Sequence, residues 1–226
     1  MVHGGPETTV VSGPDYTTPN WAASALVVVD LQRDFLDGGA AAVPGTSAVV
    51  PRVAALTAAF RAAGRPIAHI VRLYRPGGSD VDLPRRRHIE QGGRVVAPGS
   101  DGAQIPAEVL PAPVSLDSER LLAGREQTVG AREVVLFKPR WSAFHRTRLE
   151  DWLRDQGCDT VVVAGCNLPN CPRATLFDAS ERDFRAVLVV DAVSQTSPER
   201  LADLERIGVR LADTGTVRRA LSVPAR

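Results

Sequence analysis

Residues 160–191 read TVVVAGCNLPNCPRATLFDASERDFRAVLVVD, and this stretch indicates the fold. Two apolar runs, at 160–164 and 186–191, flank a segment with helical character at 171–183. Runs that are apolar on both faces are typical of buried strands in parallel sheets. A strand, a helix and a second strand at this spacing predict a right-handed βαβ unit.

The same alternation extends along most of the chain. Further strands are expected at 25–30, 66–71, 133–138 and 209–212, and helices at 47–63, 147–156 and 197–207. We therefore expect a single-domain α/β protein with three layers, α/β/α, and a Rossmann-like, mainly parallel sheet of six strands.

Two segments lack this alternation. Residues 1–23 are rich in Gly, Pro, Thr and Ser, and we expect a flexible N-terminal arm that leads into a domain spanning 24–226. Residues 74–132 contain several Gly and Pro pairs and too few apolar residues for a core of their own. We interpret them as a long excursion on the rim of the sheet, of the kind that forms lids or binding loops.

Composition excludes several classes of protein. The 226 residues include 27 Lys and Arg against 26 Asp and Glu, so the net charge of +1 provides no field to attract nucleic acid or an anionic membrane. No stretch approaches the length of a membrane span, and the N-terminus has no signal-peptide pattern. Three cysteines, an odd number, favour a reducing cytoplasm over a disulfide-stabilised secreted protein.

Three reactive residues occur where strands of the predicted sheet end. Asp30 follows the first strand, Lys138 ends the third, and Cys171 lies just past the fourth, at the start of a helix. Ligands of such sheets bind beyond the carboxyl ends of the strands. Lys138 is also the only lysine in a chain that otherwise uses Arg, which indicates a position that needs a compact ammonium.

These residue types together suit acyl transfer. A helix N-terminus and a nearby ammonium both favour the thiolate form of Cys171, so we expect a lowered thiol pKa. Asp30 is suited to accept the thiol proton and to return it to a leaving amine. The backbone N–H groups of Asn167 and Cys171 are expected to form an oxyanion hole.

With these residues, the chain resembles the isochorismatase-like cysteine hydrolase superfamily, which includes nicotinamidases, N-carbamoylsarcosine amidohydrolase and isochorismatases. The resemblance extends from about Ala25 to Asp191 through four stretches: VVVDLQRDF, PGTSAVVPRVAAL, LFKPRWSAF and AGCNLPNCPRATLFDASERDF. It implies an Asp30–Lys138–Cys171 triad, a cis peptide between Cys166 and Asn167, and a homo-oligomer.

Two departures from the superfamily pattern bear on function. Leu168 stands where many members have Thr, and 71–76 lack the Asp-x-His metal ligands of nicotinamidases. We therefore predict no metal or cofactor and a substrate other than nicotinamide. His88 and His145 have no partner at metal-ligand spacing.

Substrate contacts are less clearly marked. Gln32 lies two residues after Asp30, while Trp141 and Phe144 follow Lys138 and are candidates for the pocket wall. Arg85 and Arg87, in the rim excursion, are candidates to bind a substrate carboxylate.

The sequence thus predicts a cytoplasmic cysteine hydrolase that cleaves an amide or ureido C–N bond of a small molecule through a thioester. Two alternatives stay open: an isochorismatase-type ether hydrolase, and a catalytically silent member that binds a partner. The strand order is also open. The chemistry favours an order that places the first, third and fourth strand ends together, and a 3-2-1-4 order with a reaching lysine is the alternative.

Overall fold

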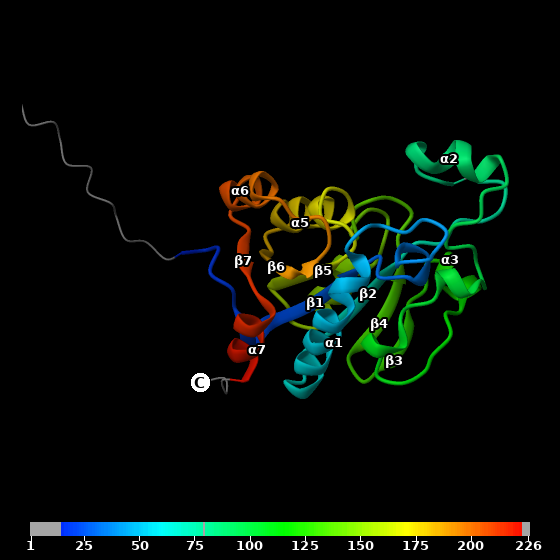
Figure 1. Cartoon of the computed structure of the whole chain (residues 1–226). Coiled ribbons are helices and arrows are strands. Elements are labelled where there is room, and N and C mark those ends of the chain that lie inside the picture. Colours follow the sequence, from blue (N-terminus) through cyan, green and yellow to red (C-terminus); the bar gives the residue numbers. More distant parts are fainter. Residues whose placement is uncertain (1–14, 79, 223–226) are drawn as a thin grey trace, which may run out of the picture.

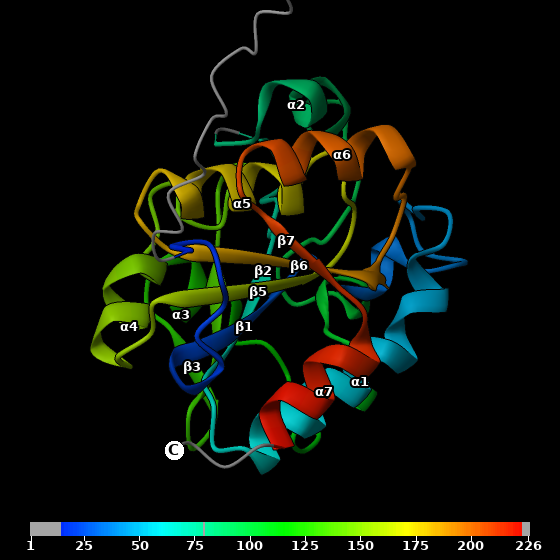
Figure 2. The same ribbon diagram turned by 90° about the vertical axis from the view of Figure 1, so that its left-hand side faces the viewer.

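A seven-stranded sheet with helices on both faces forms the centre of the protein (Figures 1 and 2). The structure is a computed structural model and describes residues 15–78 and 80–222. The strands are β1 (Ser24–Val29), β2 (Ile67–Val71), β3 (Gln127–Gly130), β4 (Glu133–Phe137), β5 (Thr160–Gly165), β6 (Arg185–Val193) and β7 (Arg210–Ala212). The α/β class is confirmed, but the predicted number of six strands is wrong.

The extra strand is β3, which lies at the edge of the sheet. The strand order is β3-β4-β2-β1-β5-β6-β7, and only the β3–β4 pair is antiparallel among the pairs of this sheet. Counted without β3, this is the 3-2-1-4 order, so β2 separates the strand that ends beside Lys138 from the strand that ends beside Asp30. The order favoured by the chemistry alone is therefore wrong.

The helices form the two outer layers. They are α1 (Thr46–Ala62), α2 (Leu83–Glu90), α3 (Ser118–Leu122), α4 (Leu149–Asp155), α5 (Cys171–Ser180), α6 (Pro198–Arg206) and α7 (Thr214–Ser222). Alternate residues of β1 face opposite layers, as the two-residue repeat of a strand requires. Leu26 and Val28 pack with α1, whereas Val27 packs with side chains from α4, α5 and α6.

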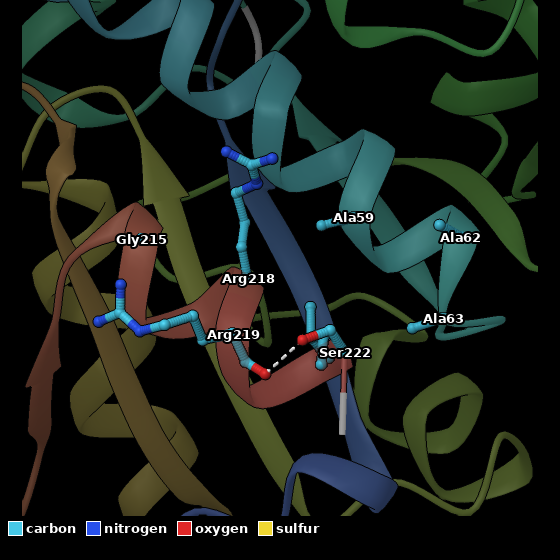
Figure 3. A pocket seen from close by; sticks show the side chains of 8 residues that line it. Ala59, Ala62, Ala63, Gly215, Arg218, Arg219 and Ser222 are labelled. Carbon is cyan, nitrogen blue, oxygen red and sulfur yellow. Dashed lines mark hydrogen bonds between the residues drawn. The ribbon is translucent and has the colours of Figure 1, made fainter. Parts of the chain in front are cut away.

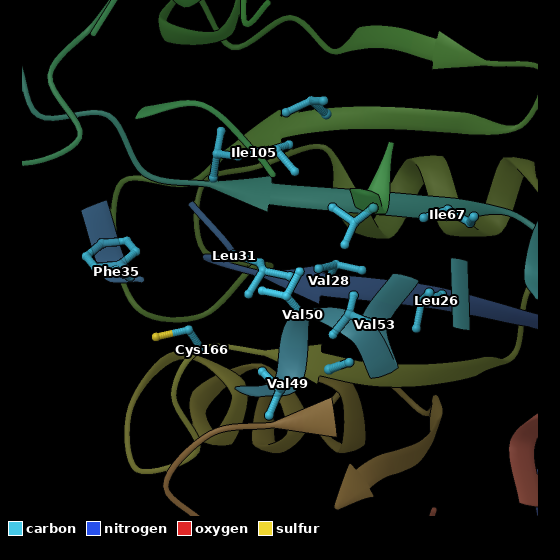
Figure 4. Close-up of a cluster of buried hydrophobic side chains, with 14 of the residues drawn as sticks. Leu26, Val28, Leu31, Phe35, Val49, Val50, Val53, Ile67, Ile105 and Cys166 are labelled. Atoms are coloured by element: carbon cyan, nitrogen blue, oxygen red, sulfur yellow. The ribbon is translucent and has the colours of Figure 1, made fainter. Parts of the chain in front are cut away.

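The α1 face of the sheet holds an apolar cluster that extends to the carboxyl ends of the strands. Val50 and Val53 of α1 lie against Leu26 and Val28 of β1 (Figure 4). Cys166 closes the cluster at the end of β5, where its sulfur is part of the same buried surface.

The rim excursion contains short elements: α2, α3 and the 3₁₀ helices η3 (Asp101–Ala103) and η4 (Ala107–Val109). It adds Val96, Ile105 and Leu121 to the α1-side core, and α2 projects from the body of the molecule in Figure 1. Of the expected N-terminal arm, 1–14 lie outside the described residues. Within the remainder, Thr17 accepts a hydrogen bond from Arg210, and the 3₁₀ helix η1 (Trp21–Ala23) leads into β1.

A hollow of about 650 Å³ lies between the C-terminal half of α1 and α7 (Figure 3). Because α1 runs back from the carboxyl edge of the sheet towards β2, this hollow lies far along α1 from the strand ends that carry Asp30 and Cys171. No helix among residues 15–78 and 80–222 is long and apolar enough to cross a membrane.

Candidate active site

Asp30 lies directly after β1 and has an unusual backbone conformation. Its φ of 49° is in the left-handed region, which Asp tolerates better than most residues, and its N–H donates to the carbonyl of Ile70. The carboxylate is buried. Oδ2 accepts a hydrogen bond from Lys138 Nζ at 2.8 Å, whereas Oδ1 has no hydrogen-bond partner among the described residues.

Lys138 reaches this carboxylate from two strands away. Its backbone N–H donates to Val71 at the end of β2, and its fully buried side chain extends past β2 to Asp30. The ammonium also donates to the carbonyl of Arg140 at 3.2 Å. A long, flexible side chain with a point charge can span the width of the intervening strand.

Cys171 is the first residue of α5 and is buried. Pro172 follows in the first turn, where its missing N–H costs no hydrogen bond. Burial raises the pKa of the Cys171 thiol, and the negative charge of Asp30 raises it further, while Lys138 and Arg72 act in the opposite direction. The expected lowering of the thiol pKa is therefore wrong, because loss of solvent outweighs the two cations.

The loop between β5 and α5 contains free backbone donors. The peptide between Cys166 and Asn167 is cis. Among the described residues, neither the N–H of Asn167 nor that of Cys171 donates a hydrogen bond, whereas the intervening N–H of Leu168 donates to Ser194 at 2.9 Å. The Asn167 side chain donates to Gln195 at 2.7 Å and accepts from Asn170, which fixes the loop.

Arg72 is a central charge of the site that the sequence pattern did not reveal. Its Nη2 lies 3.4 Å from Cys171 Sγ, its Nε lies 3.6 Å from Asp30 Oδ2, and its Nη1 donates to Asp82 at 2.6 Å. Tyr74 also hydrogen bonds to Asp82 and to Arg72. The available signal was its position, because Arg72 directly follows β2 at the same edge of the sheet.

A small cavity of about 40 Å³ opens beside the thiol. Its walls include Asp30, Arg72 and Cys171, and two of the expected substrate-binding residues, Arg85 and Trp141. Cys166 and Phe35 line it from the apolar cluster on the α1 side.

The other three expected substrate-binding residues lie elsewhere. The Gln32 amide donates to the carbonyls of Arg72 and Ala103 and accepts from the Arg72 N–H, so it holds the backbone of that strand end. Phe144 packs on Phe184, with ring centroids 5.8 Å apart, and Arg87 is exposed on α2. Within the part of the chain that the structure describes, no three His, Cys, Asp or Glu side chains form a group able to hold a metal ion.

The family model for the isochorismatase domain matches residues 24–212, which is most of the chain. The chain belongs to the isochorismatase family.

Curated relatives in the isochorismatase family include amidohydrolases. Ureidoacrylate amidohydrolase of Methylobacterium radiotolerans is 27% identical over 99% of this chain and 88% of its own length. Maleamate amidohydrolase of Pseudomonas putida is 33% identical over 75% of this chain and 71% of its own length. An Arabidopsis thaliana protein described as a probable inactive nicotinamidase is 32% identical over 84% of this chain and 92% of its own length.

Solved structures of the isochorismatase family share the fold. An isochorismatase family protein from Desulfovibrio vulgaris superposes with a TM-score of 0.75 at 33% identity, covering 89% of this chain and 99% of its own. N-carbamoylsarcosine amidase from Thermoplasma acidophilum superposes with a TM-score of 0.66 at 28% identity, covering 84% of this chain and 96% of its own.

Proposed function

We propose that the protein is a cysteine hydrolase that cleaves an amide or ureido C–N bond of a small molecule through a thioester on Cys171. The observation that carries this proposal is the state of the Asp30 carboxylate. One oxygen is held by Lys138, and the other is buried without a hydrogen-bond partner among the described residues, while Asp30 lines the same cavity as Cys171. An acceptor in that position is available to take the thiol proton.

The first half of the reaction forms the thioester. The thiol proton moves to Asp30 as the Cys171 sulfur attacks the carbonyl carbon, and the negative charge develops on the carbonyl oxygen. The free N–H groups of Asn167 and Cys171 are the donors for that oxygen. When the intermediate collapses, the C–N bond breaks and the leaving amine takes the proton from Asp30.

The second half releases the acid. Water loses a proton to Asp30 as its oxygen attacks the thioester carbonyl, and collapse of the second intermediate breaks the C–S bond. The sulfur then recovers the proton from Asp30. Arg72 Nη2, 3.4 Å from the sulfur, stabilises the negative charge that the sulfur carries in both halves.

The relatives support the class of bond. Two of them are named for hydrolysis of a ureido compound, ureidoacrylate, and of an amide, maleamate, and N-carbamoylsarcosine is also a ureido compound. One relative is described as probably inactive, and for this reason a catalytically silent protein is the second candidate function.

The test is ammonia release by purified, reduced protein from a panel of small amides and ureido compounds. We expect the Cys171→Ala variant to lose at least about a thousandfold in kcat. Intact-mass spectrometry of the wild type is expected to show an acyl adduct that maps to Cys171. Cys158→Ala is the matched control, because Cys158 precedes β5 at the opposite edge of the sheet, and it should retain wild-type turnover.

Two results would contradict the proposal, and they point to different alternatives. Turnover of an isochorismate-type ether that survives in Cys171→Ala would indicate ether hydrolysis without a cysteine nucleophile. Absence of both turnover and acyl adduct across the panel would indicate the silent, partner-binding alternative. The homo-oligomer and the cytoplasmic location stay predictions from the sequence.

A further inference from the structure

Most charges at the cavity are paired with each other. Lys138 and Asp30 form an ion pair at 2.8 Å, and Arg72 and Asp82 form a second at 2.6 Å. Each pair contributes one positive and one negative charge, so together the four groups leave the cavity without a net charge. A further charged side chain, Arg85, lines this cavity together with Asp30, Arg72 and Asp82.

Arg85 has no carboxylate partner within ion-pair distance among residues 15–78 and 80–222. It projects from the first turn of α2, is half-buried, and its guanidinium carbon lies 5.9 Å from the centre of the Phe35 ring. This contact places the guanidinium over a side chain that also lines the cavity.

The neighbouring arginines of α2 differ from Arg85 in position. Arg86 donates two hydrogen bonds to the carbonyl of Val81, which occupies its guanidinium. Arg87 is exposed and does not line the cavity. Of the three consecutive arginines, Arg85 alone therefore offers an uncommitted guanidinium to the cavity that contains the Cys171 thiol.

We propose that the site takes a short acidic amide, whose carboxylate pairs with Arg85 while its amide carbonyl lies at Cys171. A guanidinium binds a carboxylate through two parallel, charge-assisted hydrogen bonds, which also orient the ligand. Because Arg85 and Cys171 line one small cavity, the carboxylate and the amide belong to one short molecule. This inference rests on the proposed function, since it names the substrate class of the same site.

The test measures binding without turnover. Alkylation of Cys171 by iodoacetamide is followed by peptide mass spectrometry in the presence of malonate, succinate or glutarate, and of the corresponding diamides. At least one dicarboxylate is expected to slow the alkylation, while its diamide, which has the same length and no charge, does not.

Two variants then locate the responsible charge. In Arg85→Gln, the dicarboxylate concentration that gives half-protection should rise at least about tenfold. In Arg87→Gln, which removes the same charge from the same helix, it should rise less than about twofold. Thermal unfolding of both variants checks that α2 and the body remain folded.

Three results would overturn the inference: equal protection by diamides and dicarboxylates, equal shifts in the two variants, or no protection by any dicarboxylate. Failure of the proposed function looks different. Protection of Cys171 that depends on Arg85, together with no release of ammonia from any monoamide, would support the anion site and overturn the proposed hydrolase. Release of ammonia from neutral amides alone, with no effect of Arg85→Gln, would support the hydrolase and overturn the anion site.

Discussion

The thiol of Cys171 lies near two cations, Lys138 and Arg72, yet burial and Asp30 keep its pKa above the ordinary value. Such a thiol holds its proton in the resting protein. In the proposed mechanism, the base that removes this proton lies in the same cavity, so the nucleophile forms when a substrate carbonyl is present to accept the electron pair. Burial also raises the pKa of Cys166 and Cys158 to about 11, which leaves both unreactive near neutral pH.

Replacing Asp30 with Asn should separate thiol reactivity from turnover. The charge of Asp30 raises the pKa of Cys171, so its removal should move the midpoint of Cys171 alkylation down by about one to three pH units. Loss of the base should lower turnover by about two to four orders of magnitude. Rates of iodoacetamide modification across pH, with peptide mapping, measure the first effect.

Lys138→Met should shift the same midpoint in the opposite direction. The ammonium lowers the pKa of the thiol, so its removal raises the pKa and slows alkylation at a given pH. Shifts of equal sign in the two variants would show that each substitution disturbs packing rather than charge, and would remove both residues from the site.

At this scale the sequence was informative about three residues and uninformative about a fourth. Asp30, Lys138 and Cys171 stand at strand ends, and Lys138 is the only lysine, so their placement at one edge was predictable. Arg72 was not singled out, because the chain is rich in arginine and a guanidinium is usually solvated. Its burial follows from long-range contacts with Asp82 and Cys171 that no local pattern contains.

At the scale of elements, the junction of β5 with its loop depends on one glycine. Gly165 has a φ of 117°, and a Cβ atom there would lie 2.2 Å from the carbonyl oxygen of Val29 in β1. The close approach of the two strand ends places the loop that carries Asn167 next to Asp30. A side chain at Gly165 would push this loop away from β1.

Gly165→Ala should therefore destabilise the protein and its site together. We expect a loss of at least about 2 kcal/mol in the free energy of unfolding, from the left-handed φ and the backbone clash. Gly157→Ala is the control, since Gly157 has a φ of 70° but a Cβ atom there would meet nothing within 4 Å, and it should lose only about 1 kcal/mol. Denaturant unfolding measures both, and equal losses would refute the close-approach argument.

The strands β1 and β5, which the sequence predicted, share one property, which is burial on both faces. The runs at β1 and β5 are apolar and fully buried, so their pattern is unambiguous. Strand β3, with the sequence QTVG, is short, half-exposed and held by antiparallel pairing to β4. It is a strand because it pairs with β4 and not because of its composition, so the sequence of the rim excursion did not predict it.

At the scale of the whole molecule, a second buried charge cluster joins helix and sheet away from the thiol. Glu133 at the start of β4 accepts hydrogen bonds from Arg61 of α1 and lies 2.6 Å from His69 of β2. Burial raises the pKa of Glu133, but Arg61 and His69 outweigh it, so the folded-state pKa is below the ordinary value.

This cluster predicts the acid sensitivity of the fold. A carboxyl whose pKa is lowered by folding stabilises the native state above its unfolded pKa, near 4.5, and loses this contribution as pH falls through the folded value. The free energy of unfolding should therefore fall below about pH 4.5. In Glu133→Gln this part of the pH dependence should be flatter, as urea titrations at several pH values would show. An unchanged slope in the variant would refute the assignment.

The strand order also belongs to this scale, and the sequence did not determine it. Either order lets Lys138 meet Asp30, because the lysine side chain, the aspartate side chain and the hydrogen bond between them together span the width of an intervening strand. The choice depends on how the apolar faces of β2 and β4 fit between the two helix layers, which is a property of the assembled sheet.

Placing β2 between β4 and β1 has a consequence for how the protein is made. Lys138 and Asp30 are 108 residues apart in the chain, and Arg72 and Cys171 are 99 apart, so the reactive group comes together only after four neighbouring strands have paired. Contacts of such long range form slowly and late. A nascent or partly unfolded chain therefore has neither Asp30 nor the two cations beside Cys171, and the site exists only after the chain has been made past α5 and these four strands have paired.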